Sequence, residues 1–249
     1  MLVLVEPAGP LNVGSVARLC ANFGLAQLRL VAPRCDHRGE EAVRMAVHGR
    51  ALLERALVMP DLESAIADCH RVVACSGRVD SDAVPVEGPE QALNWLLEGP
   101  AAAAPSDSRT ALVFGREDRG LSIDELLQAG RILQIATGAD YPSLNLSHAV
   151  AVTLHELQRA RSLRANAGAA AAPGDGGGED PALRGALEAT LADAQELLLE
   201  VGFLYPHTAH ARMAKLRTLL QRGQISGPEV ALLRGMVRQL RWASRRRTT

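Results

Sequence analysis

Three short segments carry the polar residues best suited to chemistry. GPLNVGSVAR places Asn12 at the expected N-cap of a helix and Arg18 two turns further along. VFGREDRGL presents Glu117 soon after an apolar run, and YPSLNL contains Ser143 and Asn145. A guanidinium, a carboxylate, a hydroxyl and an amide can together hold a phosphate or a ribose and manage a proton. Each segment alone is more typical of helix caps and turns, so the chemistry requires a fold that brings them together.

Short apolar runs alternate with longer segments of helical spacing in the first two thirds of the chain. The runs predict buried strands over residues 2–6, 27–33, 71–77, 110–115 and 131–137. The segments between them predict helices over residues 13–23, 41–56, 62–69, 89–98 and 122–129. This alternation indicates an α/β fold with a parallel sheet and helices on both faces. Ligands of such sheets bind beyond the carboxyl ends of the strands, so we expect the three polar segments to meet there.

Several common classes are disfavoured by the sequence. No predicted strand is followed by GxGxxG, GxxxxGK[ST] or GxSxG, which argues against a dinucleotide fold, a P-loop and a nucleophile elbow. The four cysteines show no CxxC spacing, so we expect reduced thiols and no metal. The sequence shows no secretory signal and no apolar run long enough to span a membrane, which predicts a cytoplasmic protein without a membrane partner.

The three polar segments follow a recognisable order along the chain. N-x-G-x-x-x-R, then F-G-R-E-x-x-G-L, then Y-P-S-L-N-L resembles the SpoU branch of the SPOUT RNA methyltransferases, over residues 1 to about 160. The resemblance implies a parallel sheet with a deep C-terminal trefoil knot, and a homodimer formed through the knot region. True knots are nearly absent from proteins, so only the resemblance supports this expectation.

The resemblance also implies a cofactor, S-adenosyl-L-methionine, held by the loops of the knot and converted to S-adenosyl-L-homocysteine. The residues that match the cofactor pocket are Cys75, Ser76, Gly77, Gly115, Ile135, Pro142, Ser143 and Leu144. Cys75 stands where many relatives have a polar residue such as threonine, so we expect its backbone to make the contact. No metal is implied, because a sulfonium is already an activated methyl donor.

Arg18 is the catalytic residue that the resemblance implies for methyl transfer to a ribose 2′-hydroxyl. A guanidinium is a poor base, so clamping a phosphate or stabilising the developing alkoxide is its easier role, and a role as general base stays open. Asn12 would orient Arg18 or the ribose, and Glu117 would position the arginine. Ser143 or Asn145 would donate or accept a hydrogen bond to the substrate.

The last third of the chain differs from the rest in charge and composition. Residues 1–164 hold 16 Arg against 20 Asp and Glu, whereas residues 181–249 hold 11 Arg and Lys against 5 acids. Between them, residues 165–180 are rich in Ala and Gly and predict a flexible linker that would leave the tail mobile. We therefore expect a methyltransferase domain over 1–164 and a small all-α extension over 181–249, whose positive charge suits a polyanion.

The extension resembles that of the TrmJ-type tRNA methyltransferases in its GFL opening, its M-x-K-L-R helix and its LLRGMVRQL close. Those enzymes methylate the 2′-hydroxyl of nucleotide thirty-two in the tRNA anticodon loop, on cytidine or uridine. The expected phosphate contacts are Arg212, Lys215, Arg217, Arg222, Arg238 and Arg241. The alternative for about half of these six is packing through their aliphatic stems at a dimer interface. Phe203 and Trp242 are expected in the core.

Three other interpretations stay open at this point. The substrate could be ribosomal RNA or another tRNA position, because the SpoU segments are shared. A non-catalytic RNA-binding protein could use the same fold, although the intact polar segments count against it. A flavodoxin-like module with a helical tail is the fold-level alternative.

Overall fold

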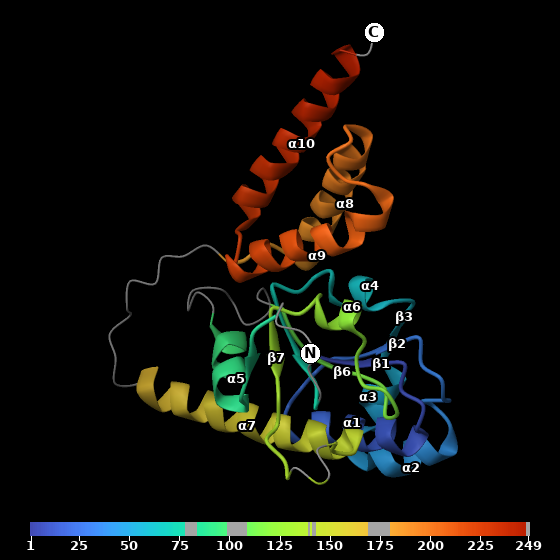
Figure 1. Ribbon diagram of the computed structural model, residues 1–249. Helices are drawn as coiled ribbons and strands as arrows, with labels where there is room; N and C mark the ends of the chain where they lie inside the picture. The colour runs from blue at the N-terminus through green and yellow to red at the C-terminus, as the bar shows by residue number, and fades with distance from the viewer. Residues whose placement is uncertain (78–83, 99–108, 139, 141–142, 169–179, 248–249) are drawn as a thin grey trace.

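One parallel sheet organises the first part of the molecule (Figure 1). The computed structural model describes residues 1–77, 84–98, 109–138, 140, 143–168 and 180–247. Within them, seven strands lie in the order β3-β2-β1-β6-β4-β7-β5. Their bounds are β1 Leu2–Val5, β2 Leu28–Val31, β3 Leu57–Met59, β4 Arg71–Cys75, β5 Val86–Glu87, β6 Thr110–Phe114 and β7 Arg131–Leu133.

Helices cover both faces of the sheet. They are α1 Pro10–Asn22, α2 Glu40–Ala46, the 3-10 turn η1 Val47–Gly49, α3 Arg50–Glu54, α4 Leu62–Ile66, α5 Pro89–Leu97, α6 Ile123–Leu126 and α7 Leu146–Gly168. Leu2 and Leu4 of β1 belong to the core shared with α1, α2, α3, α5 and α7. Val3 and Val5 belong to the core shared with α4 and α6. Burial on both faces explains why the central strands are apolar without alternation.

The sequence predicted five of these strands and missed two at the edges. β3 was missed because Leu57 and Val58 are exposed and directly follow the helix expected over residues 41–56. β5 has only two residues. The single helix expected over 41–56 is instead α2, η1 and α3, since the chain bends at Val47, whose φ of 49° is in the left-handed region.

Glycines let α1 approach its neighbours closely. A Cβ on Gly14 would lie 2.2 Å from the carbonyl oxygen of Ala42 in α2. A Cβ on Gly49 would lie 2.5 Å from the backbone of Ala17. Both close approaches therefore require glycine, since any Cβ would overlap the neighbouring backbone.

Three helices form the C-terminal domain: α8 Arg184–Glu200, α9 Pro206–Arg222 and α10 Gly227–Arg247. Their own core contains Leu187, Leu191, Leu204, Met213 and Val230. Ser226 precedes α10 and donates its N–H and its hydroxyl to the carboxylate of Glu229. Helix α7 continues to Gly168, four residues into the expected linker, and residues 169–179 lie outside the described part of the chain.

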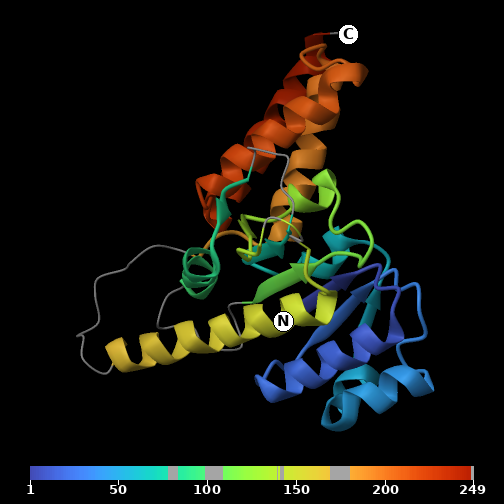
Figure 2. The same ribbon diagram turned by 60° about the horizontal axis from the view of Figure 1, so that its bottom comes forward.

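The helical domain packs on the amino ends of the sheet strands rather than standing free. The N–H groups of Arg184 and Gly185 donate to the carbonyls of Cys69 and Ala67, both at 2.9 Å. Arg71, the first residue of β4, donates to Gln224 at 3.0 Å. Figures 1 and 2 show α8 and α9 stacked over the end of the sheet that carries α4 and α6. The mobile tail expected from the linker is thus a docked domain in this structure.

Among the described residues, no helix is both long and apolar enough to cross a membrane. The same residues contain no group of three His, Cys, Asp or Glu side chains placed to hold a metal ion. All four cysteines are free thiols, and Cys35 and Cys75 are only half-buried.

Candidate active site

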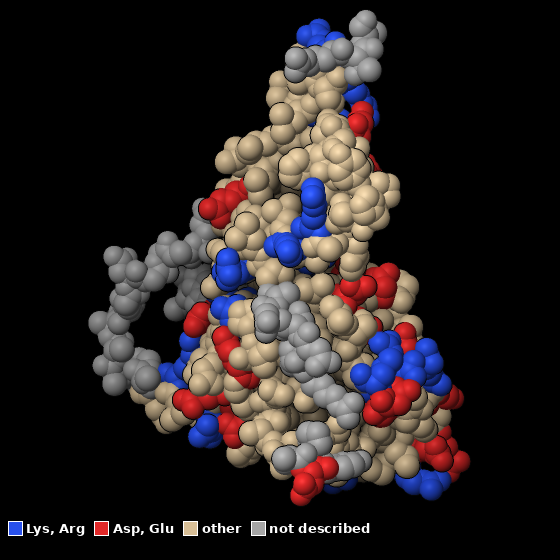
Figure 3. All heavy atoms as spheres, viewed as in Figure 1, with Lys and Arg blue, Asp and Glu red and all other residues tan. Residues whose placement is uncertain are grey.

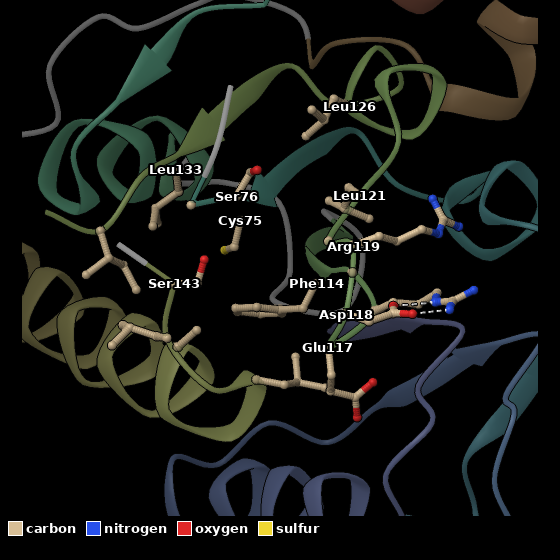
Figure 4. Close-up of a pocket in the computed structure, with 18 of the residues that line it drawn as sticks. Cys75, Ser76, Phe114, Glu117, Asp118, Arg119, Leu121, Leu126, Leu133 and Ser143 are labelled. Atoms are coloured by element: carbon tan, nitrogen blue, oxygen red, sulfur yellow. Dashed lines mark hydrogen bonds and ion pairs between the residues drawn. The ribbon is translucent and has the colours of Figure 1, made fainter. Parts of the chain in front are cut away.

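A cavity of about 420 Å³ opens where β4, β6 and β7 end. Its lining includes Cys75, Phe114 and Leu133, the last residues of those strands. In Figure 4, Cys75, Ser76 and Ser143 border one side of the cavity, and Leu121 and Arg119 border the other. The cavity lies where parallel sheets bind ligands, as the order of strands and loops predicted.

Most of the residues expected at the cofactor pocket line this cavity. They are Cys75, Ser76, Gly77, Gly115, Ile135, Ser143 and Leu144. Pro142, the eighth, lies outside the described residues. The sequence interpretation did not include Phe114, Arg116, Asp118, Arg119, Leu121 and Thr137, which also line it. Five of these six belong to the VFGREDRGL segment, so the whole segment was the signal and not Gly115 alone.

The VFGREDRGL segment folds into a tight turn. Gly120 donates to the carbonyl of Arg116 at 2.9 Å and has a φ of 71°. A Cβ on Gly115 would lie 2.2 Å from the carbonyl carbon of Gly120, so the two arms of the turn touch through this glycine. Glycine is required at both positions, at one for the close approach and at the other for the left-handed backbone.

Glu117 joins this turn to the start of α1. Its carboxylate accepts hydrogen bonds from the N–H groups of Ala8 and Gly9, both at 3.0 Å, and from Asn12 Nδ2 at 3.1 Å. Burial alone would raise the pKa of Glu117, but these hydrogen bonds outweigh it and hold the pKa below its usual value. An anionic group beside the first turn of a helix is also favoured by the helix dipole.

The expectation that Asn12 caps α1 was wrong. Gly9 is the N-cap, Pro10 is the first residue of the helix, and Asn12 is its third. Proline suits that first position because its missing N–H would have no partner there. Asn12 instead uses its side chain to hold Glu117, which places it at the rim of the site.

Glu6 forms ion pairs with three arginines at the same strand ends. Its carboxylate lies 2.9 Å from Arg34, 3.0 Å from Arg116 and 3.6 Å from Arg119. The hydrogen bond from Arg116 lowers the pKa of Glu6, and the neighbouring guanidiniums add to that effect. Glu6 has a φ of 46°, a strained conformation that this network holds in place. These ion pairs connect the loops that follow β1, β2 and β6.

Arg18 lies apart from this network. It is exposed on α1 and does not line the cavity. Among the described residues its side chain has no hydrogen bond or ion pair. Leu11 and Ser15 share its face of the helix at the i, i+4, i+7 spacing, and Leu11 is 52% exposed. The structure therefore joins Asn12 to Glu117 but brings Arg18 to neither.

The YPSLNL segment serves both the cavity and α7. Asn145 accepts hydrogen bonds from the N–H of Ser147 at 2.9 Å and from its hydroxyl at 2.7 Å, so it caps the helix as one interpretation predicted. Leu146 is buried and anchors the first turn. Ser143 and Leu144 line the cavity. The mixture of loop-forming and apolar residues thus ends one loop and starts one helix.

Comparison with known proteins decides the family. Residues 1–155 match the model of the SpoU rRNA Methylase family, and residues 185–249 match that of the tRNA methyltransferase TrmJ, C-terminal domain. The chain belongs to the SpoU methylase family. It is 34% identical to the tRNA (cytidine/uridine-2′-O-)-methyltransferase TrmJ of Cronobacter sakazakii, over 95% of this chain and 93% of the relative. It is 32% identical to the tRNA (cytidine/uridine/adenosine-2′-O-)-methyltransferase TrmJ of Pseudomonas aeruginosa, over 98% and 94%.

Two solved structures are also similar to this SpoU methylase. The structure of TrmJ from Z. mobilis ZM4 aligns with a TM-score of 0.81 at 30% identity and covers 96% of this chain and 97% of that one. The SpoU methyltransferase AviRb from Streptomyces viridochromogenes, solved in complex with AdoMet, shares the fold at 19% identity with a TM-score of 0.50. That alignment covers 65% of this chain and 57% of AviRb.

The thiol of Cys75, in the SpoU methylase domain, is in its unreactive protonated form. Burial raises the pKa of the Cys75 thiol to about 12. Its sulfur lies 4.0 Å from the hydroxyl of Thr153 in α7. The next residue, Ser76, donates its N–H to Leu133. The thiol thus packs between β4 and α7 as a neutral group, and the expected backbone contact of Cys75 with the cofactor stays a prediction.

The six basic residues of the tail divide into two groups. Arg217 makes a two-point ion pair with the nearly buried carboxylate of Glu188, at 2.7 to 3.0 Å. Arg241 donates to the carbonyl of Asp193 at 2.7 Å and reaches Glu196 at 3.3 Å. Arg212, Lys215, Arg222 and Arg238 are exposed. Figure 3 shows the basic side chains of this domain as separate spots on a largely uncharged face. Two of the six are therefore held by acceptors within their own domain, and packing at a dimer interface stays a prediction.

Proposed function

We propose that this chain transfers a methyl group from S-adenosylmethionine to a ribose 2′-hydroxyl of tRNA. The observation that carries the proposal is the full-length likeness to relatives named tRNA 2′-O-methyltransferases, which extends through the helical domain. The strand-end cavity supports it, since it is built from the same loops that the SpoU resemblance singled out. A tRNA substrate would place the enzyme in the cytoplasm.

We place the modified ribose at nucleotide thirty-two of the anticodon loop, on cytidine or uridine. The TrmJ-type tail supports this choice over another RNA. The family model that matches the first domain is described for ribosomal RNA methylases, but the tail matches a domain described for a tRNA methyltransferase. The tail is therefore the part of the chain that favours a tRNA substrate over a ribosomal RNA substrate.

The cavity fits S-adenosylmethionine in size and lining. Ligand sites of this kind span roughly 300 to 1,000 Å³ and combine apolar walls with a few polar groups. Ile135 and Leu144 would supply walls, and the backbone of residues 75–77 and 115 would supply hydrogen bonds. Glu117 and Asp118 also line the cavity, as do Arg116 and Arg119, so its lining carries charges of both signs. The bound cofactor would supply an activated methyl group.

The chain would be organised as a knotted methyltransferase domain over 1–164, a linker over 165–180 and a helical domain over 181–249. The segment after β7 would form a deep trefoil knot, as the SPOUT resemblance implies. Ser143 and Leu144, after β7, share the cavity with residues 75–77, after β4, which supports this arrangement.

A homodimer through the knot region would complete the site. Helices α1 and α7 pack together, and large apolar residues between 38% and 52% exposed lie on them or beside them: Leu11 of α1, Val152 of α7 and Leu144 just before α7. Arg18 lies on the same face of α1 as Leu11, so covering this surface with a second copy would place Arg18 against the partner. Arg18 would then serve the partner's cavity rather than its own.

The catalytic work falls to a few side chains. Arg18 would clamp an RNA phosphate or stabilise the oxygen that loses its proton. Glu117 and Asn12 would act as positioning residues, since they fix the start of the helix that carries Arg18. Ser143 lies in the cavity and would hydrogen-bond the ribose, and Asn145 would hold the helix cap beside it.

The test is methyl transfer in vitro from labelled S-adenosylmethionine to a tRNA with cytidine at nucleotide thirty-two. The matched control is the same tRNA with 2′-deoxycytidine at that nucleotide, which lacks the accepting oxygen. We expect label on the first RNA and none on the second. Equal labelling of both would contradict the assignment, because the methyl group would then be on a base or at another position.

A further inference from the structure

The helical domain exposes all of its aromatic rings. The chain has only 3 Phe, 2 Trp and 2 Tyr, and three of these seven lie in the domain: Phe203, Tyr205 and Trp242. They are 62%, 55% and 52% exposed, whereas Trp95 and Phe114 of the sheet domain are 6% and 2% exposed. The expectation that Phe203 and Trp242 lie in the core was wrong.

The domain core is complete without these rings. Leu204, between Phe203 and Tyr205, is 2% exposed and packs with Leu187, Leu191 and Met213. Exposed aromatic rings cost free energy in water, roughly 25 cal/mol per Å² of apolar surface left unburied. A domain that buries one leucine and displays the two rings beside it is built to present them.

The loop that displays Phe203 and Tyr205 is held firmly. Gly202 ends α8 with a φ of 76°, the left-handed conformation common at helix ends. Leu204 donates its N–H to the carbonyl of Leu198 at 2.9 Å. Pro206 is the first residue of α9, where its fixed φ favours the helix. The rings therefore project from a rigid turn, and binding through them would cost little ordering entropy.

Cationic side chains accompany the rings. The guanidinium of Arg212 lies 5.9 Å from the centre of the Phe203 ring, and that of Arg246 lies 4.3 Å from the centre of the Trp242 ring. Tyr205 stacks on His207 with ring centres 5.9 Å apart and planes 20° apart. Neither Arg212 nor Arg246 has an ion pair with a carboxylate within the described chain. The rings of Phe203 and Trp242 thus each present an apolar surface beside a guanidinium that is not neutralised by a described carboxylate.

The two arginine-bearing rings lie at the same end of the domain. Arg245 of α10 lies 3.3 Å from Glu200 at the end of α8, only three residues before Phe203. Figure 2 shows the C-terminal part of α10 beside the turn between α8 and α9. This end is the one remote from the sheet domain, so it is open to a large ligand.

We propose that Phe203, Tyr205 and Trp242 are stacking platforms for unpaired bases of the tRNA, with Arg212 and Arg246 placed for the flanking phosphates. This assignment rests on the proposed function. Unpaired bases are recognised by stacking on aromatic rings and guanidinium planes, and their phosphates supply the negative charge that these arginines lack. The domain's 11 Arg and Lys against 5 acids favour a polyanion over a neutral protein surface.

Binding measurements with ring-to-leucine variants test the proposal. Phe203→Leu and Trp242→Leu keep an apolar side chain and remove the ring, so each is expected to weaken tRNA binding about 10-fold. The slope of log Kd against log salt should stay unchanged, because no phosphate contact is removed, whereas Arg212→Gln should lower it by about one. The matched control is Leu232→Ala, which removes a 66% exposed apolar side chain from α10 without touching a ring.

A direct readout comes from fluorescence. Trp242 is one of two tryptophans, and the other, Trp95, is buried. Only the exposed ring of Trp242 is open to a base, so stacking should quench the Trp242 emission. Single-stranded RNA should quench the wild-type protein, a duplex of equal length should not, and Trp242→Phe should abolish the effect.

The outcomes separate this proposal from the proposed function. If the wild type methylates tRNA while the leucine variants bind it with unchanged Kd, the stacking assignment is wrong and the enzymatic assignment stands. If the leucine variants instead change the sedimentation of the protein without RNA, the rings are a protein contact and the assignment also fails. Absence of methyl transfer by the wild type would overturn the proposed function itself.

Discussion

At the scale of single residues, the role that we propose for Arg18 separates catalysis from cofactor binding. Its guanidinium is exposed, lies outside the cavity and has no partner within the described residues. Arg18→Ala should therefore abolish methyl transfer, by at least ~100-fold, and leave the Kd for S-adenosylmethionine within a few-fold. Arg18→Lys, which keeps the charge and loses the planar fork, is the matched comparison. Normal turnover by the alanine variant would remove Arg18 from the mechanism.

Glu117 is the residue whose charge links the site to stability. Its pKa is lowered in the folded protein, so its contribution is fully present above the unfolded value of about 4.3 and is lost as pH falls through the folded value. Glu117→Gln should lower the free energy of unfolding by about 1 kcal/mol at pH 7. Urea denaturation from pH 7 to pH 3 should show the two proteins converging at the acid end. A difference that does not change with pH would contradict this account.

At the scale of elements, the turn over residues 115–121 depends on Gly115. A Cβ there would overlap the backbone of Gly120 and Leu121, which lie 2.2 and 2.4 Å from its position. These are backbone atoms, which cannot move aside as the end of a flexible side chain could. Gly115→Ala should therefore destabilise the protein by roughly 2 kcal/mol or more and displace Glu117 from α1. Gly138→Ala, which would meet no atom within 4 Å, is the matched control. Equal unfolding free energies would show that the turn is not close-packed in solution.

Elements in the interior could be predicted from the sequence, and those at the margins could not. Central strands such as β1 and β6 are buried on both faces, so their apolar runs are unmistakable. β3 and β5 lie at the edges, where exposure or shortness removes the pattern. The strand-end rule located the cavity loops. The pairing of Glu6 with Arg116 was beyond the sequence, since 110 residues separate them.

The direction of individual side chains was the second feature that could not be predicted from the sequence. An aromatic residue within a helical tail is usually core, yet Phe203 and Trp242 point outward. Asn12 looked like a helix cap because asparagine prefers that position, but Pro10 starts the helix two residues earlier. Propensity describes one residue at a time, and these positions were decided by neighbours distant in the sequence.

At the scale of the whole molecule, the helical domain is docked on the sheet domain through the start of α8. Gly185 approaches Ala67 closely, since a Cβ on Gly185 would lie 3.1 Å from the Cβ of Ala67. Gly185→Leu should therefore loosen the docking and leave the strand-end cavity intact. Hydrogen exchange should increase at residues 67–70 and 184–186, with an unchanged Kd for S-adenosylmethionine. Unchanged exchange would show that this contact does not hold the domains together.

We propose that the cavity at the ends of β4, β6 and β7 binds S-adenosylmethionine, and calorimetric titration measures this binding. Ile135→Trp would fill the cavity from its wall, whereas Leu57→Trp adds the same ring on the exposed edge strand β3. We predict one site per chain for the wild type and for Leu57→Trp, and at least ~10-fold weaker binding for Ile135→Trp. Binding that is absent from the wild type, or equal in all three proteins, would contradict the account.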